Sequence, residues 1–517
     1  MAERTKAGDS KSLERVHARS AGSNPAPSAT ITISMPQDKL LLELLPKAVD
    51  ITDNSKEVKK GSIFFAIKGT KLDGHTFLGE VLKKSPLAVV VEKSYKPPKG
   101  LDFSSTHLIK VENTRKSFAK ACKEFFGKPD ERLKVFGITG TNGKTSTSHI
   151  LAQLLENSGC PTGIIGTVEY RLGSKIYGKG WTTPHPKVWF KTLTQMLLDG
   201  AKAVSAEISS HALDQYRIYS THFEGVIFTN LSQDHLDYHQ SMEKYYLSKK
   251  RLFTDYQYKV GITNIDNPYG RRLFQEIPNL VSFGKSPDAH YRILDYSLTL
   301  EGSKVSLQLP DKRKVVLEIP LLGEFQIYNT VGAFALLHTL GWNLNDLLEG
   351  IKNLKPIPGR FEVIQIGGRT VIIDYAHTPD ALENLLRSVK KLQRGGRLIT
   401  LFGAGGNRDK TKRPLMGKVA SKYSDILVIT SDNPRWEEPQ EIINHILEGV
   451  NSNIPTVVEV DRRKAIKRAI LEISQEGDII VIAGKGHEDY QEIKGVKYPF
   501  SDRQEVLKLK EETQDWL

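Results

Sequence analysis

VFGITGTNGKTSTSHIL, at residues 135–151, has the order of residue types expected for a buried strand, a glycine-rich turn and the first turns of a helix. Glycines at positions 140 and 143 let backbone N–H groups approach phosphate oxygens, and a helix N-terminus favours negative charge. Lys144 can then reach the outer phosphates of a nucleotide, and the Thr145 hydroxyl can ligate Mg²⁺. The stretch therefore predicts a phosphate-binding loop.

One glycine of this loop departs from the usual spacing. The common pattern places its first glycine five residues before the second. This chain has Ile138 at that position, and its glycine stands one residue earlier, at Gly137. A glycine turn that binds no nucleotide is the alternative, but the preceding strand and the Lys-Thr pair favour a nucleotide site.

Strands alternate with helical patterns on both sides of the loop. Short strands such as SIFFAIKG and LAVVVE indicate a small α/β unit at residues 37–131. A larger unit at 132–356 includes AKAVSAEIS, GVIFTNL and KVGITNID, and a third at 357–517 includes TVIIDYAH, RLITLFG, DILVITSD and DIIVIAGKG. Buried strands that alternate with helices imply a mostly parallel sheet, so the pattern predicts three α/β domains.

Composition and charge favour a soluble globular enzyme. Hydrophobic residues make up 39% of the 517 residues, and no apolar run approaches the roughly 18 residues needed to cross a bilayer. Cys122 and Cys160 lie far apart, so we expect free buried thiols, no disulfide framework and a cytoplasmic location. We also expect a monomer. The net charge of +13 is scattered without an aromatic-interleaved stripe, which argues against nucleic-acid binding.

The first 36 residues contain AGSNPAPSAT, which is rich in small residues and proline and has no apolar periodicity. We predict an unstructured tail or an upstream extension, with Met35 as a plausible start. The stretch has basic residues but no apolar core of the secretory type, so it is not a secretory signal.

Metal-ligand side chains follow two strands of the central unit. SAEISSHALDQYR places Glu207 at the end of one strand, and FTNLSQDHLDYH places Asp234, His235, Asp237 and His239 just after another. Phosphoryl transfer needs oxygen or imidazole ligands that hold metal at strand ends facing the phosphate loop. A single histidine here is more often structural, but the set favours a metal site.

Seven motifs occur in the order found in a known enzyme family. They are GITGTNGKTSTS, AEISSHALDQYR, NLSQDHLDYH, YYLSKKRLF, GRFE, DYAHTPDALENLL and FGAGGNRDKTKRPLMG. Together they resemble the Mur ligases, the ATP-dependent enzymes that add amino acids to UDP-N-acetylmuramic acid. The resemblance runs from about Thr52 to the C-terminus. It implies a UDP-binding N-terminal domain, a central ATPase domain and a C-terminal Rossmann-like domain that closes over the amino acid.

The resemblance also implies ATP, Mg²⁺ and the residues that bind them. The positions that would bind ATP are Gly140, Thr141, Asn142, Gly143, Lys144, Thr145, Ser146, Asn264, Asp266, Asn329, Arg360 and Asp374. Thr145 and Glu207 would hold one Mg²⁺, and His235 would help to hold a second. Lys144, Glu207, His235 and Lys249 would form the catalytic set.

Lys249, in YYLSKKRLF, falls where the family carries an N-carbamylated lysine. Carbon dioxide adds only to a neutral amine, so burial must lower the pKa of this lysine. The carbamate would then supply an anionic oxygen ligand for Mg²⁺. Without the resemblance, the Lys-Lys-Arg run would favour an ordinary surface lysine at this position. Because Lys250 is adjacent, either lysine could be the one that matches the family's carbamylated position.

The later motifs resemble the branch that extends UDP-N-acetylmuramoyl-L-alanyl-D-glutamate in peptidoglycan precursor synthesis. By this resemblance the residues that would contact the nucleotide-sugar dipeptide are Ser55, Thr70, Lys71, Leu72, Thr182, Thr183, Ser209, Gln215 and Arg217. Their hydroxyls and amides suit a diphosphate and a peptide carboxylate, and Arg217 can pair with the carboxylate. A turn or capping function is the alternative for any one of them.

TSDNPRWEEP resembles enzymes of this branch that select meso-diaminopimelate rather than L-lysine. Arg435 can grip the second carboxylate of diaminopimelate, where lysine would present a cation. Arg408 resembles a further carboxylate partner. The full set implied for diaminopimelate is Arg408, Asp432, Asn433, Pro434, Arg435, Gly484 and Glu488.

The reaction implied by the family has two steps. The terminal phosphoryl group of ATP moves to the γ-carboxylate of the D-glutamyl residue, and the diaminopimelate amine attacks the resulting acyl phosphate. His211 is a candidate general base, but histidines in such positions are more often structural, and we assign it no catalytic function. The alternatives are an L-lysine-adding ligase of the same branch, a folylpolyglutamate synthetase and, from another class, a P-loop switch or nucleic-acid-stimulated ATPase.

Four positions depart from the family pattern. Asn54 stands where an acidic residue is usual, Lys56 stands where arginine is common, and Trp181 precedes the threonine pair. These three loosen the uridine-site assignments. Gln326 replaces the usual asparagine and bears on one contact on the adenine side.

Overall fold

The computed structural model describes residues 37–69, 72–299 and 301–514. The prediction of a tail at residues 1–36 and the assignments of Thr70 and Lys71 lie outside the described residues. Every helix within the described ranges is too short or too polar to span a bilayer. Cys122 and Cys160 are free and buried, which confirms the expectation from their spacing.

The N-terminal unit is a small parallel sheet with strand order β1-β2-β3-β4. Its strands are β1 (Ile51–Thr52), β2 (Ile63–Phe65), β3 (Ala88–Glu92) and β4 (His107–Val111). Its helices are α1 (Gln37–Leu44), α2 (Leu78–Leu82) and α3 (Thr114–Phe125). One face of the sheet contributes Ile63 and Phe65 to a core shared with α1 and α3, and the other face packs Phe64 against α2.

The central sheet is the largest in the described chain, with strand order β15-β14-β13-β12-β11-β10-β5-β9-β6-β7-β8. Its parallel part consists of β5 (Lys134–Thr139), β6 (Thr162–Ile165), β9 (Ala203–Glu207), β10 (His222–Phe228), β11 (Gln257–Asn264), β12 (Val281–Gly284) and the start of β13 (Tyr291–Thr299). Strand β5 lies inside this sheet and is buried on both faces. Val135 joins one hydrophobic core, and Phe136 and Ile138 join the other. This burial explains the apolar run before the phosphate loop.

Antiparallel strands extend the central sheet at both edges. They are β7 (Tyr170–Leu172) and β8 (Lys175–Gly178) at one edge and β14 (Gly302–Gln308) and β15 (Lys314–Ile319), which continue from β13, at the other. The helices of this unit are α4 (Lys144–Asn157), α5 (Pro186–Leu198), α6 (Ser210–Asp214), α7 (Leu236–His239), α8 (Met242–Thr254), α9 (Pro268–Glu276), α10 (Glu324–Thr339) and α11 (Leu344–Lys352). Helices α4 and α10 share one core, and α5 and α8 share the core on the opposite face.

The C-terminal unit has strand order β16-β17-β21-β18-β19-β20, parallel except for the β16–β17 pair. Its strands are β16 (Glu362–Ile366), β17 (Arg369–Asp374), β18 (Leu398–Phe402), β19 (Ile426–Ile429), β20 (Thr456–Val458) and β21 (Ile479–Ala483), followed by the hairpin β22 (Tyr490–Ile493) and β23 (Val496–Pro499). Its helices are α12 (Pro379–Leu392), α13 (Lys412–Tyr423), α14 (Pro439–Leu447), α15 (Arg462–Lys467) and α16 (Asp502–Gln514). Helices α12, α13 and α14 cover one face, and α15 and α16 cover the other.

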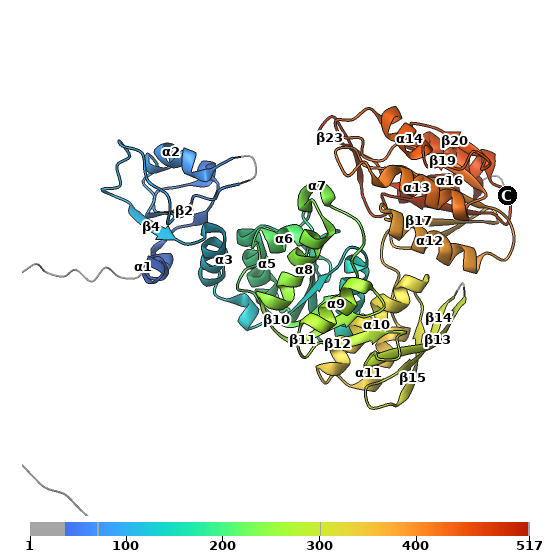
Figure 1. Ribbon diagram of the computed structural model, residues 1–517, viewed down its shortest axis with the longest axis horizontal. Helices are drawn as coiled ribbons and strands as arrows, with labels where there is room; N and C mark the ends of the chain where they lie inside the picture. Colours follow the sequence, from blue (N-terminus) through green and yellow to red (C-terminus); the bar gives the residue numbers. More distant parts are fainter. Residues whose placement is uncertain (1–36, 70–71, 300, 515–517) are drawn as a thin grey trace, which may run out of the picture.

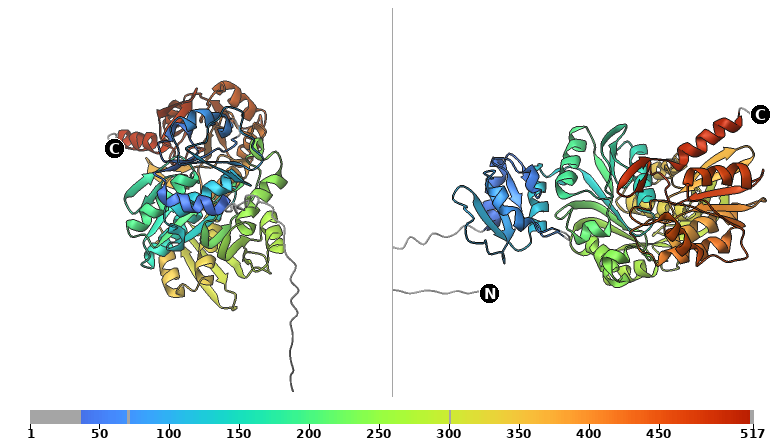
Figure 2. Two further views of the ribbon diagram at one scale, coloured as in Figure 1. Left: turned by 90° about the vertical axis from the view of Figure 1, so that its left-hand side faces the viewer. Right: turned by 90° about the horizontal axis from the view of Figure 1, so that it is seen from above.

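The three units follow one another in space as they do in the chain. Figure 1 and the right-hand view of Figure 2 place the N-terminal unit at one end of the molecule, the central unit in the middle and the C-terminal unit at the far side. The expected class of three α/β domains with mostly parallel sheets is confirmed. In the central and C-terminal units, turns at the carboxyl ends of the parallel strands carry the predicted site residues.

A fully buried ion pair attaches α16 to the C-terminal sheet. The Arg462 guanidinium donates from Nε to Asp502 Oδ1 at 2.7 Å and from Nη2 to Asp502 Oδ2 at 2.8 Å. Both side chains are 0% exposed. Arg462 also donates to the backbone oxygens of Ser431 and Ala483, so it joins α16 to the strand ends.

Replacing Asp502 with alanine should leave this guanidinium buried without its counter-charge. We expect the free energy of unfolding of the C-terminal unit to fall by about 3–5 kcal/mol, measured by urea denaturation. Arg503→Ala is the matched control, because Arg503 is the next residue of α16 and forms an exposed ion pair with Glu362. Its loss should cost under about 1 kcal/mol. Equal losses in the two variants would contradict the stabilising contribution of the buried pair.

Candidate active site

The phosphate loop joins β5 to α4, as the sequence predicts, and borders a cavity of about 430 Å³. Gly143 has a φ of +85°, and a Cβ there would collide with Asn329 Oδ1 on α10. Glycine is therefore required for both the left-handed backbone and the close approach of α10. The loop backbone is further fixed by Asn230, whose side chain bonds Asn142 N and Asn142 O.

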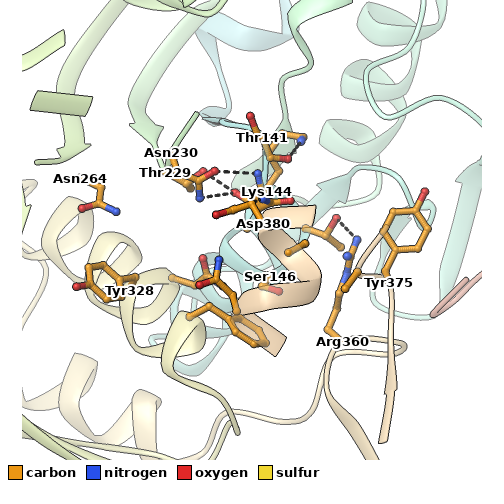
Figure 3. A pocket seen from close by; sticks show the side chains of 18 of the residues that line it. Thr141, Lys144, Ser146, Thr229, Asn230, Asn264, Tyr328, Arg360, Tyr375 and Asp380 are labelled. Carbon is orange, nitrogen blue, oxygen red and sulfur yellow. Dashed lines mark hydrogen bonds between the residues drawn. The ribbon is translucent and has the colours of Figure 1, made fainter. Parts of the chain in front are cut away.

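Lys144 and Thr145 begin α4 and point to different partners. Lys144 Nζ donates to the carbonyl oxygens of Gly140 and Thr141 at 3.0 and 2.9 Å, so its ammonium lies over the loop, and burial lowers its pKa. Thr145 Oγ1 donates to Glu207 Oε2 at 3.0 Å and accepts from Arg360 Nη2 at 2.9 Å. Figure 3 shows Lys144 between Thr141 and Asp380. Arg360 lies on the side of the cavity where Tyr375 lies.

The donor set around Glu207 fits a magnesium ion. Glu207 is 1% exposed at the end of β9, and its carboxylate accepts hydrogen bonds from the hydroxyls of Thr145 and Thr167 and from the Thr167 N–H. Mg²⁺ binds hard oxygen donors and uses few protein ligands, since it keeps waters and substrate phosphates in its shell. A carboxylate and a hydroxyl beside the phosphate loop meet that requirement.

The histidines and aspartates after β10 do not gather with Glu207 into one ligand set. Among the described residues, no three side chains of His, Cys, Asp or Glu come close enough to hold a metal. His239 is buried against Ser210, with Nε2 and Oγ 2.9 Å apart, and Asp237 is exposed. The short helix α7 separates these side chains because residues three or four apart share a face and neighbours do not.

His235 is the histidine of this segment that borders the cavity. It has a φ of +54°, and its Nε2 lies 3.4 Å from Asp234 Oδ2. Burial lowers its pKa to about 3, so the ring is neutral near pH 7 and its nitrogens can accept a proton or a metal. Burial likewise lowers the pKa of His211 to about 4. The ring of His211 packs edge-on against that of His235, and this packing agrees with a structural function for His211.

Lys249 is buried on α8 and Lys250 is not. Lys249 is 1% exposed, and its Nζ donates to Gly140 O at 2.8 Å and lies 4.8 Å from the centre of the Tyr245 ring. Burial and the nearby charge of Lys144 hold its pKa well below the ordinary value. Lys250 instead forms an ion pair with Glu276 on the outer side of the helix. Of the two adjacent lysines, Lys249 is the one that combines contact with the phosphate loop and a lowered pKa, the two conditions for carbamate formation beside the phosphates.

The cavity is closed by residues from both the central and the C-terminal units. Figure 3 shows Asn264 and Tyr328 on one side and Arg360 and Tyr375 on the other. Asp266 and Asp374 also line the cavity. Tyr328 donates to Asp266 Oδ2 at 2.8 Å. The Arg360 guanidinium stacks over Tyr375 at 4.6 Å.

Two predicted residues in this cavity are fixed by neighbouring groups. Burial raises the pKa of Asp374, which accepts the N–H groups of Phe361 and Ala376. Gln326 accepts a hydrogen bond from Asn329 Nδ2 at 3.0 Å and so orients that amide. The glutamine that replaces the family's usual asparagine at position 326 therefore contacts the predicted ATP-binding residue Asn329. Ser146 also lines the cavity from the first turn of α4.

The residues predicted for the nucleotide-sugar dipeptide fall into two groups. Thr182, Thr183, Ser209, Gln215 and Arg217 form one bonded cluster beside Glu207. Within it, Arg217 donates to Thr183 O at 2.9 Å and stacks over Trp181 at 4.5 Å.

The other group lies in the N-terminal unit. Ser55 begins a short 3-10 helix (Ser55–Glu57) capped by the side chain of Asn54, and Leu72 is 69% exposed. Among the described residues, no hydrogen bond or ion pair joins these two side chains to the Thr183 cluster. The N-terminal and central units do meet nearby, because His185 Nε2 lies 2.9 Å from Asp53 Oδ2. His185 is two residues after Thr183, and Asp53 is two residues before Ser55.

The residues predicted for diaminopimelate lie together at the carboxyl ends of β18, β19 and β21. Asn433 Nδ2 donates to Glu488 Oε2 at 2.8 Å, and Gly484 has a φ of +116° with its Cα facing the Asp432 carboxylate. Arg435 follows Pro434 with a φ of +54° and donates from Nη1 to Gly406 O at 2.8 Å. Arg408 is exposed on the loop after β18, and its charge lies near His211 of the central unit.

The strand-end loops of the central and C-terminal units face each other. Asn142 of the phosphate loop donates to Asp380 Oδ2, in the first turn of α12, at 2.8 Å. Gln233 donates to Thr411 Oγ1 at 3.2 Å, in the loop that follows Arg408. The phosphate loop and the loop of Arg408 are therefore both in contact with the opposite unit.

Several polar residues of this region escape prediction from the sequence. Lys485 is 0% exposed and donates to both Asn433 Oδ1 and Glu488 Oε2. Glu492 lies 3.3 Å from Arg435 Nε, and Thr167 shares the Glu207 carboxylate with Thr145. Lys485 carries a usable signal, since it stands between two glycines directly after the strand IIVIA. Thr167 and Glu492 carry none, because their partners are remote in the sequence.

Comparisons with known proteins agree with this arrangement. Residues 138–337 match the Mur ligase middle domain, and residues 359–486 match the Mur ligase glutamate ligase domain. A UDP-N-acetylmuramoyl-L-alanyl-D-glutamate–2,6-diaminopimelate ligase of Aquifex aeolicus is 52% identical over 489 residues, which cover 94% of this chain and 98% of that protein. The enzyme of the same name from Geobacter sulfurreducens is 39% identical and covers 88% of this chain and 92% of that protein.

A solved structure of a UDP-N-acetylmuramoyl-L-alanyl-D-glutamate–2,6-diaminopimelate ligase also resembles this fold. It gives a TM-score of 0.65 at 32% identity and covers 90% of this chain and 95% of that chain. The resemblance drawn from the motifs is confirmed, and the alignment extends far beyond them. The chain belongs to the Mur ligase family.

Proposed function

We propose that this chain is an ATP-dependent amide ligase that joins meso-diaminopimelate to UDP-N-acetylmuramoyl-L-alanyl-D-glutamate and releases ADP and phosphate. The named relatives support this function, since the alignment spans nearly the whole chain. The observation that carries it is the apposition of the phosphate loop and the C-terminal strand ends through Asn142–Asp380 and Gln233–Thr411. An amine held by the second unit can thereby approach a carboxylate activated in the first.

Each unit has a separate task in this proposal. Residues 37–131 bind the uridine diphosphate part, residues 132–356 bind ATP, and residues 357–517 bind the incoming amino acid. The small N-terminal sheet contacts the central unit through Lys187–Asp50 and His185–Asp53, which connects it to the end where Thr183 lies. The proposed reaction consumes ATP and a nucleotide-linked substrate, and the proposal places it in the cytoplasm, where ATP is available.

The chain's own groups position and neutralise the reacting anions. Lys144 donates to two carbonyl oxygens of the loop, so its ammonium can contact the transferred phosphoryl group once it leaves them. Arg217 and the Thr183 cluster would orient the D-glutamyl carboxylate beside Glu207. Thr145 and Glu207 would hold one Mg²⁺, His235 would help to hold a second, and carbamylated Lys249 would supply a further oxygen ligand. The ions would neutralise charge on the phosphates. The amine then attacks the acyl phosphate, and phosphate leaves as the amide forms.

The C-terminal unit would hold diaminopimelate by its charged ends. Arg435 and Arg408 take the carboxylates, while Glu488 and Asp432 face the ammonium groups. Lys485 offsets the charge of Glu488, because the two form an ion pair of 2.9 Å. Lysine lacks the second carboxylate and would leave one arginine without its substrate partner, at a cost in affinity.

ADP release with each substrate omitted in turn tests the proposal. We expect release only when ATP, the nucleotide-linked dipeptide and diaminopimelate are all present, with lysine at least about 100-fold less efficient in kcat/KM. ADP release that needs neither acceptor, or that nucleic acid stimulates, would overturn the ligase assignment. Equal use of lysine would overturn the amino-acid assignment alone.

A further inference from the structure

The loop that carries Arg408 and the loop that carries Arg435 are bonded directly to each other. Gly406 N donates to Asn433 O at 2.9 Å, and Arg435 Nη1 donates to Gly406 O at 2.8 Å. Trp436 N donates to Asn407 Oδ1 at 3.0 Å. The two loops follow different strands, β18 and β19, so these bonds define how far apart the arginines lie.

Glu437 closes this junction from one side. Its two carboxylate oxygens accept from Nη1 and Nη2 of Arg413, each at 3.0 Å, and one of them also accepts the N–H of Asn407. Arg413 is 0% exposed at the start of α13 and donates from Nη2 to Gly405 O as well. The loop of Arg408 is therefore held at Gly405 and Asn407 by a pair whose acidic member belongs to the loop of Arg435.

The backbone at this junction needs such support. Asn407 has a φ of +50° and Arg435 a φ of +54°, and neither residue is glycine. Left-handed backbone at such residues costs free energy and persists only where surrounding contacts hold it. Asn407 directly precedes Arg408, so a change of its backbone angle would swing the Arg408 side chain. The Arg413 guanidinium also lowers the pKa of Glu437 to about 2, which keeps this carboxylate ionised at neutral pH.

We propose that Glu437 is a positioning residue that sets the separation of Arg408 and Arg435 and thereby selects amino acids with two carboxylates. The proposal rests on the proposed function, because it gives both arginines a carboxylate to bind. Glu437 itself contacts no substrate in this account. Its effect should be confined to the amino acid, since, among the described residues, the cavity predicted to bind ATP and the Thr183 cluster predicted to bind the dipeptide contain no residue of the loops that carry Arg408 and Arg435.

A purely stabilising function is the competing explanation, because Glu437 neutralises a buried arginine. The chain offers a matched control in Asp478, which binds Arg397 through Nε and Nη2 and accepts the backbone N–H of Arg397. Arg397 and Asp478 directly precede β18 and β21, so they lie at the amino ends of these strands. Arg408 and Arg435 lie beyond the carboxyl ends, on the opposite side of the sheet. Asp478→Asn removes a similar carboxylate–arginine pair from the same unit without touching the loops.

The experiment compares Glu437→Gln with Asp478→Asn by steady-state ADP release in the full chain. We expect Glu437→Gln to raise KM for diaminopimelate about 10-fold or more, because small displacements of binding groups have large effects. KM for ATP and for the nucleotide-linked dipeptide should stay within about 2-fold. The ratio of kcat/KM for diaminopimelate over lysine should fall about 10-fold in Glu437→Gln and stay unchanged in Asp478→Asn.

Three outcomes would overturn the proposal. They are an equal rise in all three KM values, an unchanged selectivity ratio, and the same kinetic change in Asp478→Asn. If Glu437→Gln does not fold, Glu437→Asp takes its place, since it keeps the charge but shortens the reach, and the same ratios decide. Failure of the proposed function gives a different result, because wild-type protein would then show no diaminopimelate-dependent ADP release.

Discussion

Lys249→Ala should lower kcat by about 10²–10³-fold, the usual cost of removing one group that stabilises charge in the transition state. Lys249 is buried against Gly140 of the phosphate loop, and its lowered pKa makes the neutral amine available to carbon dioxide. Alanine removes both the amine and the carbamate that it would form. Binding of the nucleotide-linked dipeptide should change little, because its predicted contacts lie elsewhere in the unit.

Chemical rescue distinguishes a carbamate from a simple ammonium at this position. Formate or acetate should restore part of the activity of Lys249→Ala, since a small carboxylate can occupy the space of the missing carbamate. Methylammonium should not restore it. Lys250→Ala is the matched control and should keep activity within about 2-fold, because Lys250 forms a partly exposed pair with Glu276. Rescue by methylammonium alone would show that the cation is the active form.

Arg435→Lys should lower kcat/KM for diaminopimelate by about 10²–10³-fold although the charge is kept. The planar guanidinium bonds Gly406 O and can present a second edge to a carboxylate, whereas an ammonium group has no such fixed geometry. Activity with lysine should change much less, so the selectivity between the two amino acids should fall by a similar factor.

The measurement is the ratio of kcat/KM for the two amino acids in wild type and variant. Arg397→Lys is the control, since it alters an arginine–carboxylate pair at the amino ends of the strands, away from the loops that carry Arg408 and Arg435. If Arg435→Lys lowered activity with both amino acids equally, Arg435 would act in folding or closure rather than in recognition of the second carboxylate.

The parallel strands could be predicted because each is a short apolar run that ends at a polar turn. The stretches DILVITSD and DIIVIAGKG contain β19 and β21, as expected, and each strand ends where the polar turn begins. The antiparallel strands β13–β15 and β7–β8 were not foreseen. In β14, buried Val305 and Leu307 alternate with Lys304 and Ser306, which is a strand signal. That pattern does not say which sheet the hairpin extends, because its pairing depends on the free edge of the assembled central sheet.

The candidate site shows the same division between local and remote information. The loop geometry around Gly143 follows from adjacent residues and was predictable. The separation of Asp237 and His239 depends on the direction of the short helix α7, which starts from a left-handed His235 that the sequence does not announce. Bonds such as Arg360–Thr145 join residues 215 positions apart, and only the packing of two units reveals them.

The cavity beside the phosphate loop takes its walls from two separately folded units, and this has a thermodynamic consequence. Arg360, Asp374 and α12 come from one unit, and Lys144, Asn264 and α10 come from the other. A nucleotide that touches both walls is linked to their alignment, so each stabilises the other by the same free energy. Nucleotide affinity therefore depends on how the two units are aligned. A distant substitution that disturbs the alignment should weaken nucleotide binding even though the substituted residue does not contact the nucleotide.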